Sequence, residues 1–316
     1  MVPLKVFVTG GAGFIGSHLV DRFIDEGDAV TVYDNLSSGR KNFLEHHMEK
    51  PYFKFVKGDL LDAELLRKSM AGSELVCHLA ANPQAIEGTR NTRLDLEQNT
   101  IGTYNVLESM RINGVKKLIF TSSGTVYGDI PDIMLNEQFG PMLPISLYGA
   151  SKLACEGLIS GFVALFGVQA WIFRFGNIVG DRATHGVIYD LLLKLRSDPK
   201  TLEVLGDGEQ TKPYVWMDDC LDGVLFCLKN AKDPINLFNL APSSVTSVKT
   251  VVKILLEKTG HTETKVHYTG GVKGGGGWPG DVPKVKLDAS KAIKLGWKPK
   301  YTSDEAVAKT IEALIR

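Results

Sequence analysis

Short apolar runs alternate with stretches of helical periodicity through about the first 175 residues of the chain. The runs have the length and β-branched character of buried strands, and the stretches between them repeat apolar residues at the spacing of amphipathic helices. The pattern predicts strands at residues 4–9, 29–33, 52–56, 74–79, 116–121 and 168–174. Strands that alternate with helices in this way predict an α/β fold with a doubly wound parallel sheet.

The pattern changes beyond residue 175. Helices are predicted near residues 187–196, 219–229, 246–257 and 303–315, mixed with short strands and a glycine run from Gly274 to Gly277. A chain of 316 residues is long enough for about two domains. We expect a Rossmann-type domain over residues 1–175, with contributions from later segments. A smaller C-terminal α/β lobe over residues 176–316 would bind substrate, with the glycine run in a mobile loop.

Charge and composition limit the classes of partner that the protein is expected to bind. Lysine plus arginine (36) balances aspartate plus glutamate (36), so no global field attracts nucleic acid or an anionic membrane. No apolar run approaches the ~20 residues of a membrane span, and the first strand begins too early for a signal peptide. We therefore expect a cytoplasmic protein with neither nucleic acid nor membrane as a partner.

Cysteines and histidines give no sign of a metal centre. The four cysteines lack CxxC spacing and lie in apolar patterns, which predicts buried free thiols. His78, His185 and the adjacent His46 and His47 lack a third ligand at metal spacing along the sequence. No metal site is expected.

Three glycines follow the first predicted strand: Gly10, Gly13 and Gly16 in TGGAGFIGS. Gly10 allows a tight turn, Gly13 lets backbone amides approach a pyrophosphate at a helix N-terminus, and Gly16 lets that helix pack closely on the strand. The next strand ends in Asp34, eighteen residues past Gly16, where a carboxylate accepts hydrogen bonds from the ribose of NAD. A 2′-phosphate would be repelled there, so we expect NAD rather than NADP, although Arg40 leaves dual use open.

Tyr148 and Lys152 lie four residues apart in SLYGASK, which places them on one face of a helix. Tyrosine titrates near pH ~10, so its use as a base at neutral pH needs roughly 4 kcal/mol of preference for the phenolate. The ammonium of Lys152 and an oxidised nicotinamide would both favour the phenolate. The pair is typical of a dehydrogenase-type base, and an ordinary amphipathic helix is the alternative interpretation.

Ten segments together resemble the extended short-chain dehydrogenase/reductase family, and within it the NAD-dependent nucleotide-sugar epimerases of the UDP-glucose 4-epimerase type, archaeal-type branch. They are TGGAGFIGSHL, VYDNLSSG, GDL, HLAA, NTIGTYNVLE, SSGTVYG, YGASK, RFGNIVG, LGDGEQTKPYVWMDD and WPGD, and they span essentially the whole chain. The resemblance implies that Ser123 is the catalytic serine, Tyr148 the base and Lys152 its partner.

The resemblance also implies two sets of binding residues. The NAD site would be lined by Gly10, Gly13, Phe14, Ile15, Gly16, Asp34, Asn35, Ser38, Gly39, Asp59, Leu60, Leu79, Ala80, Ala81, Asn99, Ser122, Tyr148, Lys152 and Phe175. The sugar-nucleotide site would hold Ser123, Thr125 and Tyr148 at the sugar, Asn177 near the diphosphate, Val204 and Leu205 beside the uracil, Lys212 at a phosphate, Trp278 at the pocket, and Asp281 at the ribose of the nucleotide.

The implied reaction is C4 epimerisation of a UDP-sugar. Tyr148 would take the proton of the C4 hydroxyl while the C4 hydride passes to NAD, and Ser123 would hydrogen-bond the reacting oxygen. The transient 4-keto sugar would then turn and take the hydride back on its other face. UDP-glucose and UDP-galactose, with or without N-acetyl groups, are the expected substrates. UDP-glucuronate 4-epimerase and 4-keto-sugar reductase are the alternatives.

Some positions depart from the family pattern. Lys212 and Pro213 stand where family members commonly carry arginine and aspartate, and Trp278 stands in place of a second phosphate-binding arginine. A lysine lacks the planar fork of arginine, so the diphosphate contacts would differ. Arg182 or Lys273 would be the candidates to supply the missing charge.

Three further expectations come from the resemblance. A 4,6-dehydratase would need an acid/base pair beside the serine, where this chain has Gly124 and Thr125, so dehydration is not expected. A small Val285 at the position that gates the sugar C2 side would leave room for an N-acetyl group. Long helices near 91–111 and 148–166 would pair across a twofold axis, which predicts a homodimer. A non-catalytic NAD-sensing protein of the same fold is the other class considered, and it would have little use for the intact Ser, Tyr and Lys.

Overall fold

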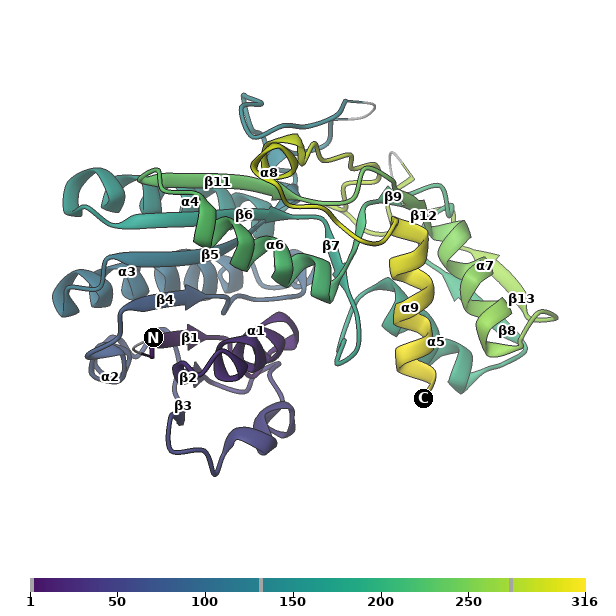
Figure 1. Cartoon of the computed structure of the whole chain (residues 1–316). Helices are drawn as coiled ribbons and strands as arrows, with labels where there is room; N and C mark the ends of the chain where they lie inside the picture. The colour runs from purple at the N-terminus through teal and green to yellow at the C-terminus, as the bar shows by residue number, and fades with distance from the viewer. Residues whose placement is uncertain (1–2, 131–132, 273–274) are drawn as a thin grey trace. The chain divides into compact units, whose positions relative to one another are not determined.

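The structure is a computed structural model that describes residues 3–130, 133–272 and 275–316 (Figure 1). Lys273 and Gly274, which the expectations above include, lie outside the described residues. The chain divides into two compact units. Unit 1 comprises Met1–Ser122, Ala150–Phe173 and Leu228–Leu237, and unit 2 comprises Ser123–Gly149, Arg174–Cys227 and Phe238–Arg316. The units are thus interleaved along the sequence, and the chain passes between them several times.

A seven-stranded sheet forms the centre of unit 1, in the order β11-β6-β5-β4-β1-β2-β3. The pairs β1–β2, β2–β3, β1–β4 and β4–β5 are parallel. This confirms the α/β class and the doubly wound sheet. The strands are β1 (Lys5–Thr9), β2 (Ala29–Asp34), β3 (Phe53–Lys57), β4 (Leu75–His78), β5 (Lys117–Ser123), β6 (Gln169–Phe175) and β11 (Ile235–Leu240).

The six strands predicted from apolar runs are all present, within two residues at each end. The edge strand β11 was not predicted. Its sequence INLFNL carries two buried asparagines, Asn236 and Asn239, which interrupt the apolar pattern. Asn236 is satisfied locally, because its side-chain amide donates to the carbonyls of Asp233 (2.6 Å) and Ala170 (3.3 Å).

The order of the strands reverses between β4 and β1, since the chain runs from β1 outward to β3 and then returns to β4 on the other side of β1. In such sheets ligands bind beyond the carboxyl ends of the strands, at the point of reversal. The carboxyl ends of β1, β2 and β4 carry Thr9, Asp34 and His78. The topology alone therefore predicts a ligand site at this edge of the sheet.

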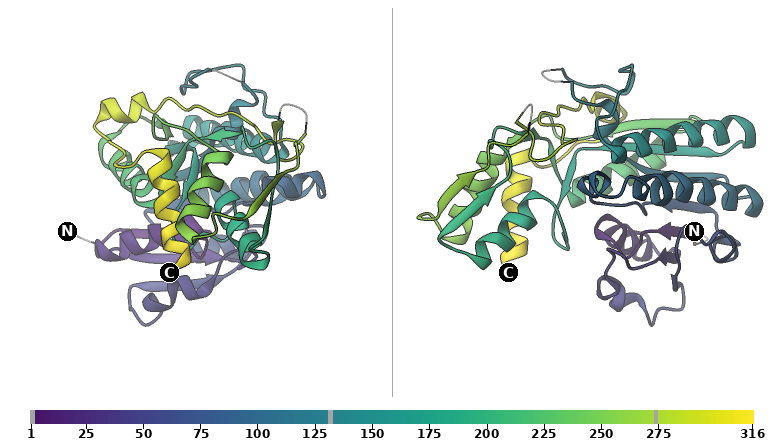
Figure 2. Two further views of the ribbon diagram at one scale, coloured as in Figure 1. Left: turned by 90° about the vertical axis from the view of Figure 1, so that its right-hand side faces the viewer. Right: turned by 180° about the vertical axis from the view of Figure 1, so that it is seen from behind.

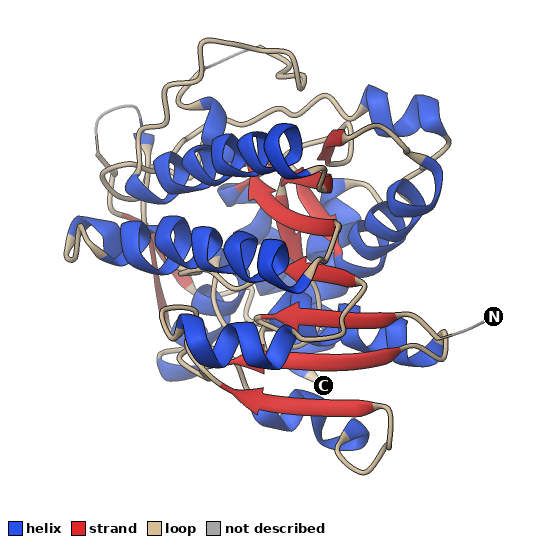
Figure 3. Cartoon of the chain, turned by 90° about the vertical axis from the view of Figure 1, so that its left-hand side faces the viewer, coloured by secondary structure: helices blue, strands red, loops and turns tan. Residues whose placement is uncertain are grey.

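Helices cover both faces of the sheet in unit 1. Helix α1 (Phe14–Asp25) packs against β1 and β2 through its buried Leu19, Val20 and Phe23. On the other face, α2 (Ala63–Met70), α3 (Gly102–Asn113) and α4 (Leu147–Phe166) join Phe7, Tyr33 and Phe120 in one apolar core. Figure 3 shows these three helices in a row in front of the strands.

The helix expected near residues 91–111 begins later than predicted. A short 3₁₀ helix covers Ala85–Thr89, and the long helix opens with a π-helical segment, Leu96–Ile101, that continues into α3. A π turn carries one extra residue per hydrogen-bonded ring, so it shifts the faces of the helix relative to a regular α-helix and is common at functional sites. Asn99, one of the expected cofactor residues, lies inside it.

Among the described residues, α4 is the one helix long and apolar enough to cross a membrane by length and composition. Core packing accounts for this composition, because Cys155, Ile159 and Val163 belong to the apolar core of unit 1. The helix also carries the buried polar residues Lys152 and Glu156, whose side chains are hydrogen-bonded within that unit.

Unit 2 contains three small sheets and its own core. The pairs are β7 (Asn177–Val179) with β10 (Tyr214–Trp216), β8 (Thr201–Val204) with β13 (Lys265–Tyr268), and β9 (Thr211–Lys212) with β12 (Thr246–Ser247). The helices are α5 (Val187–Ser197), α6 (Met217–Asn230), α7 (Val248–Thr259), α8 (Ser290–Leu295) and α9 (Ser303–Ile315). The four helices predicted for this half are α5, α6, α7 and α9. Figure 2 shows α7 and α9 side by side, where they share an apolar core with α5 and β8.

Candidate active site

The glycine turn after β1 has the geometry of a phosphate cradle. Gly10 has a left-handed backbone (φ 69°), and a side chain there would meet the backbone of Ala80 at 2.6 Å. A Cβ on Gly16 would lie 2.1 Å from the carbonyl oxygen of Gly10, so α1 can pack this closely only with glycine. Gly13 is the N-cap of α1, and no side chain of the described residues caps the helix. The first N–H groups of α1, at Phe14 and Ile15, are therefore presented as an anion site.

Asp34 ends β2 beside this turn and is 7% exposed. Each of its carboxylate oxygens accepts one backbone N–H, from Ala12 at 3.0 Å and from Leu36 at 2.8 Å. Burial raises the pKa of Asp34, and the two N–H donors oppose that shift. A Cβ on Gly39 would lie 2.8 Å from the carboxylate, so the loop can approach Asp34 only with glycine at this position. A second lone pair on each oxygen remains to accept from a ribose hydroxyl.

The carboxyl end of β3 carries a second acid. Asp59 accepts from the side-chain amide of Asn35 at 2.8 Å and from the backbone N–H of Leu61 at 2.9 Å. The hydroxyl of Tyr33 donates to the backbone carbonyl of Asp59 at 2.8 Å. The expected cofactor residues Asn35, Asp59 and Leu60 are thus brought together, whereas Ser38 lies exposed in the loop after β2.

His78, at the end of β4, links three elements of unit 1 that surround the turn. Its Nδ1 lies 2.7 Å from the hydroxyl of Thr9, and its Nε2 lies 2.9 Å from the hydroxyl of Thr103 on α3. Burial, and secondarily the charge of Lys152, lowers the pKa of His78 to about 3. The ring is therefore neutral at physiological pH and fixes where β4 ends, which is where Leu79, Ala80 and Ala81 follow.

A buried amide and carboxylate network surrounds the π-helical segment. Asp95 is 1% exposed, and its Oδ1 accepts from the side-chain amides of Asn82 and Asn99, both at 3.0 Å. Asn99 also accepts the backbone N–H of Asn82 at 2.8 Å and donates to the hydroxyl of Ser151 at 2.9 Å. Asp95 Oδ2 is buried and has no hydrogen-bond partner among the described residues. Asp95, Asn82 and Ser151 were not among the residues picked out from the sequence.

Lys152 is 3% exposed and lies in this polar region. Its ammonium donates to the carbonyl of Thr121 at 2.8 Å and lies 4.9 Å from the ring centre of Phe120. Burial lowers the pKa of Lys152 to about 8, while Cys155, Asp95 and Glu156 oppose that shift. Ser122, another expected cofactor residue, donates to Glu156 at 2.6 Å. Lys152 is therefore a cation whose charge depends on its acidic neighbours.

Ser123 and the start of α4 come together within unit 2. The Ser123 hydroxyl oxygen accepts the backbone N–H of Thr125 at 3.2 Å and the Thr125 hydroxyl at 3.0 Å, so its own proton is directed elsewhere and can be donated. The carbonyl oxygen of Thr125 lies 2.8 Å from the position that a Cβ on Gly149 would take. Tyr148, the residue before Gly149, is half-buried in the first turn of α4. The tight packing at Gly149, which the sequence analysis did not foresee, holds the segments that carry Ser123 and Tyr148 next to each other.

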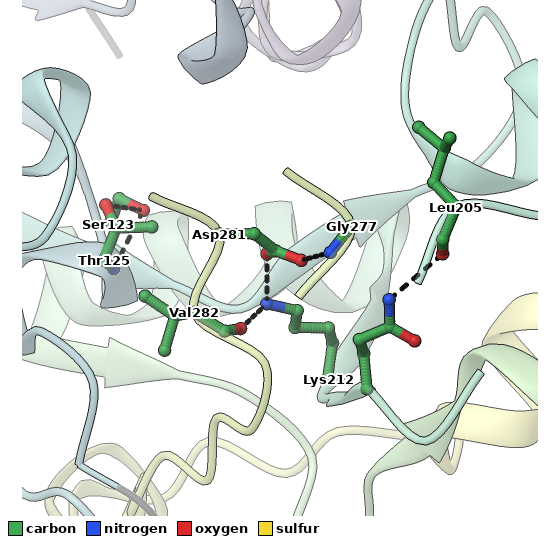
Figure 4. A network of polar contacts seen from close by, with 8 residues as sticks. Ser123, Thr125, Leu205, Lys212, Gly277, Asp281 and Val282 are labelled. Carbon is green, nitrogen blue, oxygen red and sulfur yellow. Dashed lines mark hydrogen bonds and ion pairs between the residues drawn. The ribbon is translucent and has the colours of Figure 1, made fainter. Parts of the chain in front are cut away.

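The expected sugar-nucleotide residues all belong to unit 2. In Figure 4, the ammonium of Lys212 points to Asp281, with Nζ and Oδ1 3.0 Å apart, and to the carbonyl oxygen of Val282. The other oxygen of Asp281 accepts the backbone N–H of Gly277 at 3.0 Å. The two residues expected at a phosphate and at the ribose therefore contact each other and fix the WPGD segment to β9. The sequence analysis did not foresee this pairing.

The remaining members of the set differ in accessibility. Leu205 and Asn177 are exposed and Trp278 is half-buried. Val204 is 1% exposed and belongs to the core of unit 2, so its side chain is packed inward. Phe175 is 7% exposed. A cavity of about 50 Å³ in unit 2 is bordered by Asn177, His185 and Tyr214, and it is far too small for a nucleotide sugar. The larger hollow of unit 1 lies at the amino ends of β1 and β2, away from the glycine turn.

The expectation that His46 and His47 lack a third ligand is wrong for the folded chain, although no such ligand stands at metal spacing along the sequence. Asp21 of α1 lies within hydrogen-bond distance of both rings, and the three side chains bring their ligand atoms within 4.8 Å of one another. The residues are 25 positions apart in sequence, so spacing gave no sign of the contact.

The residues of unit 1 fit NAD as the bound cofactor. A dinucleotide site requires a helix N-terminus with a glycine N-cap, a glycine turn before it, and a carboxylate at the end of the next strand. All three are present, and a Cβ would clash at two of the three glycines. Tyr148 and Phe175 belong to unit 2. The other expected cofactor residues belong to unit 1, where they follow the carboxyl ends of β1 to β5 or lie in the π-helical segment, except for Lys152 on α4.

Comparisons with known proteins agree with this geometry. Residues 6–241 match the model of the NAD dependent epimerase/dehydratase family. A putative UDP-glucose 4-epimerase of Methanocaldococcus jannaschii is 33% identical over 312 residues, which cover 97% of each chain. The crystal structure of a UDP-galactose 4-epimerase is 37% identical in sequence and superimposes with a TM-score of 0.86. The structure of the UDP-glucose 4-epimerase of Thermotoga maritima with UDP-glucose is 33% identical and has a TM-score of 0.87. Each match covers 99% of both chains. The relatives also include UDP-glucuronic acid decarboxylase 1 of Arabidopsis thaliana, 31% identical over 98% of this chain and 69% of that protein.

Proposed function

The chain belongs to the NAD-dependent epimerase/dehydratase family, and we propose that it inverts C4 of a UDP-sugar through a transient 4-keto sugar. It is an enzyme of the UDP-sugar epimerase/dehydratase group with NAD as its cofactor. The sequence resemblance to nucleotide-sugar epimerases and the expectation of NAD are thereby confirmed. The choice of reaction within the family, the substrate and the roles of the residues are our proposals.

The proposal rests on the side chains in the turn at the end of β5, which offer a hydroxyl donor and no carboxyl group. Ser123 accepts both of its hydrogen bonds from Thr125, so it can donate its proton to a sugar oxygen. Gly124 and Thr125 provide no carboxyl group beside the serine, so no acid/base pair stands there to eliminate water from the sugar. A site with one donor serine and one tyrosine base supports oxidation and reduction at a single carbon, which is what C4 epimerisation requires.

We assign the base to Tyr148 and its electrostatic support to Lys152. Tyr148 removes the proton of the C4 hydroxyl, and Ser123 holds the oxygen in line as it becomes a carbonyl. When bound, NAD supplies reversible acceptance of a hydride from C4. Protonated Lys152, four residues along α4 from the base, favours the phenolate form of Tyr148. Once the keto sugar has turned, so that C4 would take the hydride back on its opposite face, Tyr148 returns the proton to the C4 oxygen and the inversion is complete.

Firm binding of the nucleotide and a loose hold on the sugar are required, because the keto sugar must turn without leaving. We assign the nucleotide to unit 2, where Leu205 exposes an apolar surface for a base and Lys212 offers a partly buried cation. The ion pair with Asp281 lowers the free charge of Lys212, so the lysine contributes less to phosphate binding than an arginine fork would. The substrate pair we propose is UDP-glucose and UDP-galactose, with the N-acetyl forms accepted if Val285 leaves space beside C2.

We also propose a homodimer through α3 and α4, which lie side by side in unit 1. The two helices and the π-helical segment expose Ile101, Tyr104, Ile112 and Leu165, each at least 43% accessible. Isolated exposed apolar residues need no explanation, but four on neighbouring helices form a surface suited to a second copy. The size of the protein in sedimentation measurements tests this, and a monomer at micromolar concentration would exclude it.

The test of function is product analysis by proton NMR. Purified protein is incubated separately with UDP-glucose, UDP-galactose, UDP-N-acetylglucosamine and UDP-glucuronate. We expect C4 interconversion of at least one pair without net consumption of cofactor. Tyr148→Phe should lower turnover by about 10²-fold or more while NAD stays bound, whereas Tyr52→Phe, which changes an exposed tyrosine just before β3, should leave turnover unchanged. Release of carbon dioxide from UDP-glucuronate, or a 4-keto-6-deoxy product, would assign the protein to a different reaction of the family.

A further inference from the structure

Asp21, His46 and His47 form a cluster on unit 1 that no step of the proposed reaction uses. Asp21 lies in the middle of α1, and the two histidines end the 3₁₀ helix Lys41–His47. The Nε2 atoms of His47 and His46 lie 2.7 and 3.0 Å from the same carboxylate oxygen, Oδ1 of Asp21. Two imidazole nitrogens and one carboxylate oxygen thus converge on a single point.

The three side chains differ in how far they are exposed to solvent. The side chain of His47 is 2% exposed, that of Asp21 21% and that of His46 52%. The His47 ring makes tilted contacts with two others, with ring centres 3.9 Å from His46 and 5.7 Å from Phe53. Its Nδ1 is buried and has no hydrogen-bond partner among the described residues, so Asp21 is the polar group that orients the ring. One ligand is therefore held rigidly, and the solvent side remains open for water.

The donor set favours a transition metal over a hard cation. Imidazole nitrogen and carboxylate oxygen are ligands of Zn²⁺ and its neighbours, whereas Mg²⁺ and Ca²⁺ prefer oxygen alone. Three protein ligands with water in the fourth position is a common tetrahedral arrangement for zinc. Bonds of ~2.0–2.1 Å at tetrahedral angles set ligand atoms roughly 3.3 Å apart. The observed 2.7 and 3.0 Å need to open by about half an ångström, which movement of the part-exposed Asp21 side chain can provide. The ligand atoms of the three side chains already lie within 4.8 Å of one another, and the exposed His46 side chain can adjust the remaining spacing.

We propose that Asp21, His46 and His47 bind one divalent transition-metal ion of the zinc class, which takes the Nε2 lone pair of each neutral imidazole, with the ring proton on Nδ1, and joins the 3₁₀ helix to α1. The consequence is mechanical. The 3₁₀ helix directly follows the loop that carries Ser38 and Gly39, and the N–H of Arg40 in that loop donates to the carbonyl of Ala12 in the glycine turn at 2.8 Å. Bound ion would tie together two elements whose other ends carry the expected adenosine and pyrophosphate contacts. By mass action, an ion that binds the folded state alone also raises the temperature of unfolding.

The test is calorimetric titration of the holoenzyme with Zn²⁺, after treatment with a chelator. We expect one ion per chain in the wild type and at least tenfold weaker binding in His46→Ala and in Asp21→Asn. His46 is exposed, so its replacement does not threaten the core. The matched control is His267→Ala, which removes an exposed histidine of β13 and should leave the affinity unchanged. An equal loss in the control variant, or equal binding in all variants, would show only scattered surface binding and overturn the proposal.

Co²⁺ provides a second readout that does not depend on affinity. Wild type loaded with Co²⁺ should show the strong visible absorption of a four-coordinate ion, and His46→Ala should lose it. The weak absorption of six-coordinate, hydrated Co²⁺ in the wild type would contradict the assignment. A tenfold excess of Mg²⁺ or Ca²⁺ should not displace Co²⁺, and displacement by either would show an oxygen-only site. Because turnover of UDP-sugars is not part of these measurements, their outcome is independent of the proposed function.

Discussion

Replacement of Asp95 by asparagine should move the alkaline limit of activity to lower pH. Asp95 is buried and is one of the groups whose charge raises the pKa of Lys152, against the larger effect of burial. Asparagine has the same shape and can keep Oδ1 as the acceptor of the two amide bonds from Asn82 and Asn99. The substitution therefore removes a negative charge while leaving the hydrogen-bonded frame in place.

The magnitude follows from the burial of Lys152. Its pKa of about 8, instead of 10.5, means that the charged form is disfavoured by about 3 kcal/mol relative to water, since one pH unit corresponds to ~1.4 kcal/mol. A single charge within a few ångströms changes a pKa by on the order of one unit. The charged form predominates below the pKa and disappears as the pH rises through it. If charged Lys152 supports the Tyr148 phenolate, loss of Asp95 makes activity fall at a pH about one unit lower.

The assay is kcat with saturating UDP-sugar from pH 6 to 10, with retention of NAD and the circular dichroism spectrum as checks on folding. The matched control is Glu97→Gln, which removes a carboxylate two residues further on. The Glu97 side chain is 39% accessible and paired with Arg93, so solvent screens it from Lys152 and the alkaline limit should stay in place. An alkaline limit that is unchanged in Asp95→Asn, with NAD still bound, would refute the idea that the charge state of Lys152 governs this limb.

Three further predictions concern the two units. Gly16→Ala should abolish retention of NAD through the clash with the glycine turn, whereas Gly161→Ala, where a Cβ meets no atom within 4 Å, should leave NAD affinity unchanged; fluorescence titration decides. His78→Phe removes the partner of two buried threonine hydroxyls and should lower the free energy of unfolding by about 2–4 kcal/mol in urea, and a loss under 1 kcal/mol would exclude the network as a stabilising element. Lys212→Ala should raise KM for the UDP-sugar with kcat nearly unchanged. Adding Asp281→Asn should recover part of the loss, because it removes a carboxylate left without its cation. A KM equal to that of the wild type in the single variant would show that Lys212 does not contact the substrate.

The elements of the sheet could be predicted because each strand is an apolar run between turn residues. The glycine turn and Asp34 could be predicted for a similar reason, since chain geometry alone fixes a strand, a turn and a helix in that order. β11 could not be predicted, because its two asparagines look exposed in the sequence. In the folded chain they are buried, and their side-chain amides are hydrogen-bonded to distant segments.

The parts of the site that could not be predicted depend on contacts between distant segments. Lys212 and Asp281 lie 69 residues apart, and Asp21 and His46 lie 25 apart, so neither pair has a spacing that signals contact. Asp95 looks like an exposed helical acid in the sequence. In the folded chain it is buried and accepts the side-chain amides of Asn82 and Asn99, and the contact with Asn82 joins two segments whose spacing in the sequence gives no sign of it.

The central claim is that the hydrogen removed from C4 is returned to the same carbon. UDP-galactose carrying deuterium at C4 tests this directly when it is incubated with the enzyme in ordinary water and the product is analysed by NMR and mass spectrometry. The account predicts UDP-glucose with the deuterium retained at C4 and no accumulation of reduced cofactor. Loss of the label to solvent, reduced cofactor in proportion to product, or no inversion at C4 would contradict it.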